Sequence, residues 1–319
     1  MGELVAVMAA ASFAAANVMV KKGTTASSRD NGVFVSILLT AAISGLIVIA
    51  AGIINGFPTL TKEGVFWFVL AGVFTSFIGR IWLYSSIQHL GSVRASAVKR
   101  LNPFFTVLIG LFFLGDPLTI PLLIGMLMIF SGFIVMIIQS FRSSAKGNAA
   151  ATVEPGRFVE SHSMRSKIVL TLRSIANLGY MYGPISALAY AVGYALRKKG
   201  LLEIPDPFFG TMLGAGVGAL IFAVMALFQD RYRASVKSAF FQFRPWLFFA
   251  GIATSTGQIL YFMALNLITV SSVALIASTE VVFTFFLSAW VFHTQEEMTK
   301  TTIAAAFVSM TGAAVIALG

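Results

Sequence analysis

Cysteine is absent from this chain of 319 residues, and charged residues are scarce. Without cysteine the chain has no disulfide framework and no thiolate metal site. Charged residues make up 11% of the chain, against about 25% in soluble globular proteins. Acidic residues are the scarcer kind, since 12 Asp and Glu stand against 22 Lys and Arg. This composition excludes an ordinary soluble domain.

Apolar residues take the place of the missing charge. They make up 58% of the chain, with 30 Phe and a mean hydropathy of +0.89. They gather in continuous runs of about 20 residues, the length that crosses about 30 Å of hydrocarbon. Because the runs do not alternate with polar residues, they favour helices over β-barrel strands. We expect an all-α integral membrane protein with ten transmembrane helices near residues 3–22, 33–54, 65–88, 93–114, 120–139, 179–197, 207–228, 245–268, 270–292 and 301–318.

The net charge of +10 lies mainly in the connections between these runs. Lipid headgroups and membrane orientation explain basic residues in such places. No basic and aromatic module stands outside the apolar runs, so nucleic acid is not an expected partner. Taken alone, the positive-inside rule puts the basic segment 140–178 in the cytoplasm and both termini outside.

The second half of the sequence repeats the first. The run Gly79-Arg80-Ile81-Trp82-Leu83-Tyr84 has its counterpart in Gly257-Gln258-Ile259-Leu260-Tyr261-Phe262. The first apolar run ends in Lys21-Lys22-Gly23, and its counterpart ends in Lys198-Lys199-Gly200. We therefore expect two copies of one structural unit.

The copies divide the chain into a unit at 1–139, a basic linker at 140–178 and a unit at 179–319. Each unit holds five of the expected helices. An odd number of helices makes the two units insert with opposite orientation, which is the inverted-repeat plan of secondary transporters. In that plan the binding site lies near the middle of the membrane, between the copies.

Two stretches resemble the EamA branch of the drug/metabolite transporter superfamily. One is residues 84–97 with Leu101-Asn102-Pro103-Phe104, copied at 262–274, and the other begins Leu114-Gly115-Asp116-Pro117-Leu118-Thr119. The second copy departs from the pattern, since Val281 stands where the first has Pro103. The resemblance implies a ten-helix carrier of small metabolites, often an exporter of amino acids. It also implies cytoplasmic termini, so the orientation stays open.

Ionisable residues inside the apolar runs are the candidate site. A charge at the bilayer centre costs about 3 kcal/mol on insertion scales, so it usually faces a cavity or a partner. Glu280 lies near the middle of the ninth run, and Asn102 is its counterpart in the fourth. Glu280 is either a proton carrier or amine partner, or a structural carboxylate paired with a base.

Lys99 and Arg100 are the candidate bases for that pair. They could instead clamp an anion or extend to the headgroups. Arg80 lies deep in the third run, where we expect it to face a cavity or to form a salt bridge with Glu280. The further candidates for cavity lining are Tyr84, Gln258, Asn17, Trp82 and Tyr194.

These features predict a secondary active transporter that exports a small polar metabolite, such as an amino acid, by alternating access. Proton coupling is left open. The alternatives are an organic-anion or phosphate-ester exchanger and, outside transport, a membrane scaffold or lipid scramblase-like protein. No catalytic or metal-ligand pattern is present, so we expect no enzyme, cofactor or metal. The expected partners are solute and lipid, and the expected location is a bacterial inner membrane, as monomer or homodimer.

Overall fold

A computed structural model gives the structure of the chain. It describes residues 1–25, 27–28, 30–92, 95–96, 99, 101–117, 119–128, 130–132, 134–135, 181–291, 301, 304–305, 307–308, 311–312 and 315. The predicted site residue Arg100, the predicted linker 140–178 and most of the predicted tenth helix lie outside these residues.

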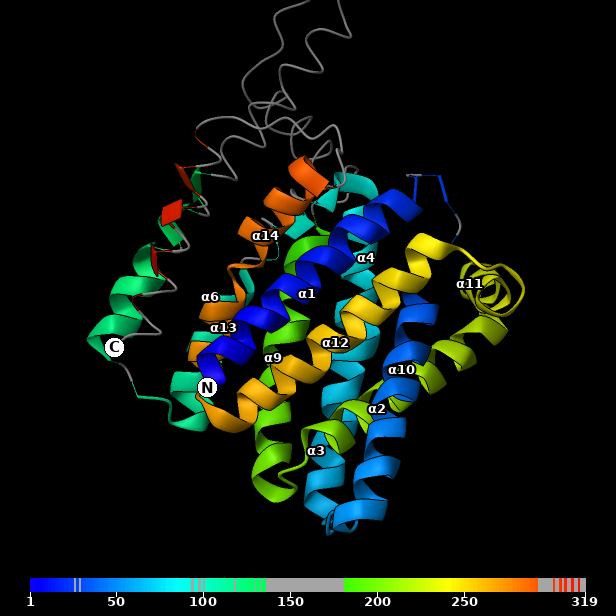
Figure 1. Ribbon diagram of the computed structural model, residues 1–319, viewed down its shortest axis with the longest axis horizontal. Helices are drawn as coiled ribbons and strands as arrows, with labels where there is room; N and C mark the ends of the chain where they lie inside the picture. Colours follow the sequence, from blue (N-terminus) through cyan, green and yellow to red (C-terminus); the bar gives the residue numbers. More distant parts are fainter. Residues whose placement is uncertain are drawn as a thin grey trace, which may run out of the picture.

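The described elements are helices (Figure 1). Those of the first half are α1 Gly2–Gly23, α2 Val33–Asn55, α3 Lys62–Gly72, the π-helix η1 Val73–Gly79, α4 Arg80–Leu90, α6 Leu101–Ile109 and the π-helix η2 Gly110–Leu114. Those of the second half are α9 Tyr182–Glu203, α10 Pro207–Phe228, α11 Asp230–Phe241, α12 Pro245–Leu267, α13 Val270–Ala277, α14 Glu280–Phe286 and the π-helix η3 Leu287–Val291.

Several helices are long and apolar enough to cross a membrane, as the composition predicted. Within the described ranges there are six: Gly2–Gly23, Val33–Asn55, Lys62–Leu90, Pro207–Phe228, Pro245–Leu267 and Val270–Ala289. Local sequence signals set their starts. Asp206 caps α10 by accepting from the backbone N–H groups of Phe208 and Phe209, and Pro207 takes the first helical position, where its missing N–H is harmless.

Helix α9 is longer than the sequence suggested. The apolar run was expected to end at residue 197, which would place Arg197 at the membrane surface. The helix instead continues to Glu203, and Arg197 is 1% exposed. The helix therefore runs on through three consecutive basic residues, whose side chains find partners inside the protein.

The connection between α10 and α12 contains a surface helix, α11, where a loop was expected. Helix α11 lies at the edge of the bundle (Figure 1) and packs on α10 and α2. Its Tyr232 and Val236 face the core, whereas Arg233 and Lys237 are exposed. Arg231 donates to Ser85 Oγ at 3.1 Å, which ties α11 to α4.

One of the expected spans is interrupted near its middle, and a second contains a turn. In the ninth, α13 ends at Ala277 and α14 begins at Glu280. The hydroxyls of Ser278 and Thr279 donate to the backbone oxygens of Leu275 and Ile276, and such bonds compete with the helical ladder. In the fourth, Lys99 lies in a turn just before α6.

The two halves of the chain exchange contacts in a reciprocal way. Helix α1 lies along α12 (Figure 1), and α9 lies along α3, η1 and α4. The Lys22 ammonium sits 4.9 Å from the ring centre of Trp246 in α12, and the Lys199 ammonium sits 5.0 Å from that of Trp67 in α3. Thus α1 packs on α12, whereas its counterpart α9 packs on α3, η1 and α4, which are the counterpart of α12 in the first half.

Glycines allow α3 and α10 to approach closely. A Cβ atom on Gly72 would lie 2.5 Å from the carbonyl oxygen of Gly214, and one on Gly218 would lie 2.7 Å from Ser76 Cβ. These positions form a small-residue seam of the kind that packs helices in lipid. Gly216, on the same helix, faces open space.

Candidate functional site

A small cavity lies between the two halves at the interrupted helices. Its walls come from α1, the turn before α6, α9, α12, and the junction of α13 and α14. Its volume is about 30 Å³, which is room for about two water molecules. The lining residues are Phe13, Ser96, Lys99, Asn102, Pro103, Tyr194, Tyr261, Ala274, Ala277, Ser278 and Glu280.

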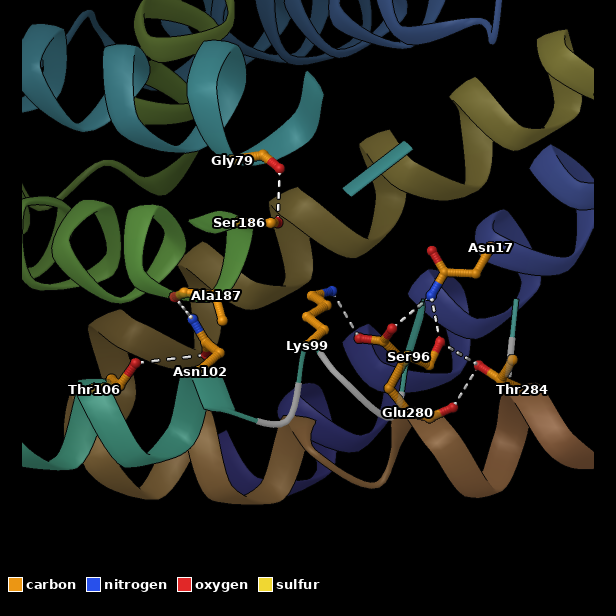
Figure 2. A network of polar contacts seen from close by, with 10 residues as sticks. All are labelled: Asn17, Gly79, Ser96, Lys99, Asn102, Thr106, Ser186, Ala187, Glu280 and Thr284. Atoms are coloured by element: carbon orange, nitrogen blue, oxygen red, sulfur yellow. Dashed lines mark hydrogen bonds and ion pairs between the residues drawn. The ribbon is translucent and has the colours of Figure 1, made fainter. Parts of the chain in front are cut away.

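Glu280 is the centre of the polar network in this cavity (Figure 2). Its Oε2 atom accepts from Lys99 Nζ at 3.0 Å, and its Oε1 atom accepts from Asn17 Nδ2. Asn17 Nδ2 also lies 3.1 Å from Ser96 Oγ. Both carboxylate oxygens therefore have partners, one of them a cation.

The Lys99–Glu280 ion pair is nearly removed from solvent. The two side chains are 11% and 9% exposed. Lys99 also lies 5.1 Å from the ring centre of Phe13 and 5.4 Å from that of Tyr190, which adds cation–π attraction. Removing one member of a buried pair typically costs about 3–5 kcal/mol, because the other charge is left without compensation.

Asn102 lines the same cavity as Glu280, its counterpart in the sequence repeat. Its amide Nδ2 donates to the backbone oxygen of Ala187 at 3.0 Å, and its Oδ1 accepts from Thr106 Oγ1 at 3.5 Å (Figure 2). These bonds fix the amide between α6 and α9. Each of the two counterpart residues thus presents a polar group to the cavity from a different half.

Arg80 has different partners from those expected. Of the two alternatives expected for Arg80, the salt bridge with Glu280 is not formed, because Glu280 is held by Lys99 while Arg80 bonds two hydroxyls of α2. Arg80 Nη1 donates to Thr40 Oγ1 at 3.0 Å and to Ser36 Oγ at 3.3 Å. The side chain is 0% exposed, and its Nε and Nη2 atoms have no hydrogen-bond partner among the described residues.

Arg197 is a buried cation that the sequence analysis missed. Its Nη2 atom donates to Thr75 Oγ1 at 2.8 Å, and its guanidinium lies 4.2 Å from the ring centre of Phe262. Its Nε and Nη1 atoms lack a partner within the described ranges. One sequence signal pointed to it: the second Lys-Lys-Gly motif is preceded by Arg197 where the first is preceded by the apolar Val20.

The remaining predicted residues lie around this centre at different distances. Tyr194 lines the cavity and stacks on Tyr261, with ring centres 4.1 Å apart. The Tyr84 hydroxyl bonds Thr254 Oγ1 at 2.8 Å, away from the cavity. Trp82 packs on Tyr182.

Gln258, the repeat counterpart of Arg80, is buried, and its Oε1 atom has no partner in the part of the chain that is described. Among the same residues, no group of three or more His, Cys, Asp or Glu side chains is placed to hold a metal ion.

Comparison with known proteins fits this architecture. The family model described as "EamA-like transporter family" matches residues 1–138 and 177–318, which confirms the resemblance seen in the sequence. A solved crystal structure superposes with a TM-score of 0.60 at 17% sequence identity, covering 99% of this chain and 96% of the other. At that identity the likeness shows a shared fold. No curated protein matches the chain.

Proposed function

Since this chain belongs to the EamA-like transporter family, we propose that it is a secondary active transporter that exports a small polar metabolite by alternating access. The family makes it an integral, multi-pass membrane transporter and not an enzyme. An amino acid or a related compound is the proposed solute. The proposed location is the bacterial cytoplasmic membrane, where the chain works as a monomer or homodimer.

The proposed architecture has ten transmembrane helices in two inverted units, 1–139 and 179–319, joined by the linker 140–178. The reciprocal contacts between the halves support it, because a two-fold axis repeats each contact once. Lys22 with Trp246 and Lys199 with Trp67 form one such pair of contacts. A second pair is made where Gly79 faces Tyr190 and Gly257 faces Phe13, since Tyr190 and Phe13 hold matching places in α9 and α1.

The main support for the proposed site is an ion pair that links the turn before α6 to the junction of α13 and α14. Lys99 lies in the turn before α6, and Glu280 begins α14. Interrupted helices near the middle of the membrane are where secondary transporters bind solutes, because unwound backbone and helix ends offer polar groups there. The cavity around this pair takes its walls from both halves.

The size of the cavity indicates how transport proceeds. With a volume of about 30 Å³ it is too small for a metabolite, so the halves must separate before a solute enters. A solute amine then competes with Lys99 for Glu280, or a solute acid competes with Glu280 for Lys99. Such a solute shifts the conformational equilibrium only through its stronger binding to the open state.

Protons offer a second means of breaking the same ion pair. A proton taken up by the Glu280 carboxylate would remove the charge that holds Lys99 and would free Lys99 and Asn17 for a solute. We propose this exchange at Glu280 as the step that couples solute export to a proton gradient. Asn17 supports the proposal, because its amide already donates to Glu280 and can reorient toward a solute.

The second candidate function is an organic-anion or phosphate-ester exchanger. Arg80 and Arg197 favour it, because both are buried and both retain N–H groups that have no partner among the described residues. In that case Glu280 would be structural, and transport would not respond to a proton gradient.

Flux in reconstituted liposomes tests the proposal. We expect saturable counterflow of at least one amino acid, faster with an imposed proton gradient, and at least a tenfold loss in Glu280→Gln when flux is normalised to folded protein. Normal pH-dependent flux in Glu280→Gln would refute the role of Glu280. Saturable flux of organic acids or phosphate esters that ignores the gradient would favour the exchanger. No saturable flux of any solute would favour a scaffold or a scramblase.

A further inference from the structure

Two buried arginines, Arg80 and Arg197, lie in the core outside the lining of the Lys99–Glu280 cavity. Arg80 begins α4, directly after the π-helix η1, and Arg197 reaches it from α9. Arg197 donates to Thr75 Oγ1 within η1, and the backbone N–H of Arg80 donates to the carbonyl oxygen of the same Thr75. The two side chains are 0% and 1% exposed. Both buried arginines are thus bonded to Thr75.

Neither charge is balanced by an acidic residue in the described part of the chain. The ion pairs found there join other groups, and the buried carboxylates of Glu280 and Asp30 are paired with Lys99 and Arg244. The neighbours of Arg80 and Arg197 are hydroxyls and aromatic rings. A buried cation without a carboxylate is rare, since charges taken out of water are normally paired.

The two arginines also retain hydrogen-bond donors that face no acceptor. Nε and Nη2 of Arg80 and Nε and Nη1 of Arg197 are buried and have no partner among the described residues. The hydroxyl of Tyr261 is likewise buried and has no hydrogen-bond partner among the described residues. Positive charge and unpaired N–H donors therefore gather here without a carboxylate among the described residues.

We propose that Arg80 and Arg197 together bind an oxyanion, the carboxylate or phosphate group of the transported solute. A planar guanidinium offers two parallel N–H donors, the geometry that carboxylate and phosphate oxygens match. An oxyanion supplies both the missing acceptors and the missing negative charge. The proposal rests on the proposed transport function, because the closely packed side chains admit an anion only when the two halves separate.

The π-helix η1 gives a structural reason for this placement. Its wider turn brings Thr75, which holds Arg197, and Arg80, which follows η1, to nearly the same side of the helix. Such π-helical turns are frequent at functional sites. The stacked rings of Tyr194 and Tyr261 stand between Arg197 and the Glu280 cavity, since both rings line that cavity and Tyr194 lies 5.7 Å from the Arg197 guanidinium.

Anion binding by the purified protein in lipid nanodiscs tests this site without requiring flux. The probes are inorganic phosphate for the phosphate group and acetate for the carboxylate group, each compared with chloride at equal ionic strength. For wild type we expect one of the two to raise the midpoint of thermal unfolding in a saturable way, by roughly 5 °C at a hundredfold excess over its Kd. A stronger response to phosphate or to acetate assigns the anion class.

The variants are Arg80→Gln and Arg197→Gln, with the exposed surface residue Arg233 changed to Gln as the matched control. We expect both buried variants to lose the shift and Arg233→Gln to keep it. Arg80→Lys and Arg197→Lys keep the charge but lose the planar fork, and we expect them to bind at least tenfold more weakly. They provide the comparison if the Gln variants do not fold.

Equal responses of wild type to phosphate, acetate and chloride would overturn the proposal. So would an unchanged shift in Arg80→Gln and Arg197→Gln. Saturable anion binding without any solute flux would support the oxyanion site and refute the transport function. Solute flux without anion binding would refute the oxyanion site alone.

Discussion

The Lys99 ammonium lies 3.0 Å from the Glu280 carboxylate, although the two residues are 181 positions apart in the chain. Lys99 lies in a turn just before α6, and Glu280 begins α14 after the break at Ser278 and Thr279. Asn17 of α1 completes the arrangement by donating to the second carboxylate oxygen. The ion pair therefore joins the turn before α6 in one half to the junction of α13 and α14 in the other.

Stability measurements can separate the contributions that the two charges of this pair make to the free energy of unfolding. We expect Glu280→Gln alone to lower the free energy of unfolding by about 3–5 kcal/mol, because Lys99 is left buried without its partner charge. Adding Lys99→Met should recover most of that loss, since the unpaired charge is then gone. Unfolding of the single and double variants in nanodiscs measures both changes, and their difference gives the coupling energy.

Lys237→Met serves as the control for this cycle, because Lys237 is an exposed lysine on α11. It should change the free energy of unfolding by less than about 0.5 kcal/mol. If Lys99→Met fails to recover stability in the Glu280→Gln background, the buried pair is not what determines stability at this place.

Single cysteines can establish the orientation of the two halves, because the natural chain has none. Arg244, just before α12, donates to the backbone oxygens of Gly23 and Asp30, which places those segments at one end of the bundle. Ile204 packs beside Gly64, which places the end of α9 near the start of α3. The inverted plan puts these two ends on opposite sides of the membrane.

Labelling of single cysteines in sealed vesicles with an impermeant maleimide tests this arrangement. We expect Ser27→Cys and Arg233→Cys to be labelled from one side, and Thr59→Cys and Glu203→Cys from the other. All four residues are exposed. Labelling of Ser27→Cys and Glu203→Cys from the same side would indicate parallel halves and would remove the basis for the two-fold transport mechanism.

The seam between α3 and α10 should tolerate no added methyl group. Gly72→Ala places a Cβ atom 2.5 Å from the carbonyl oxygen of Gly214, so we expect it to lower the free energy of unfolding by about 1–3 kcal/mol. Gly216→Ala lies on the neighbouring helix and faces open space, so it should be neutral or stabilising by up to about 1 kcal/mol. Thermal unfolding compares the two, and equal losses would contradict the close approach at Gly72.

The amino-acid sequence by itself determined two things: that lipid surrounds the helices, and which family the chain belongs to. Long apolar runs and the low content of charge require lipid around helices, because a polar backbone cannot remain unpaired in hydrocarbon. The resemblance to the EamA family rested on short motifs such as Leu114–Thr119, and the family match bears it out. The sequence also singled out Glu280 and Lys99, because a charge inside an apolar run is conspicuous on its own.

Only the tertiary structure decided which charges meet. Local patterns placed Arg80, Lys99 and Glu280 in apolar runs, but partner choice depends on distances between segments far apart in the chain. For that reason the expected bond between Glu280 and Arg80 was wrong, while Lys99 holds the carboxylate. Arg197 was missed because a basic cluster at the end of an apolar run looks like a membrane boundary, and its burial depends on α3, η1 and α12 packed around it. The interruption at Ser278 and Thr279 was also hidden, since hydroxyl side chains are common in helices and whether they turn the backbone depends on what surrounds it.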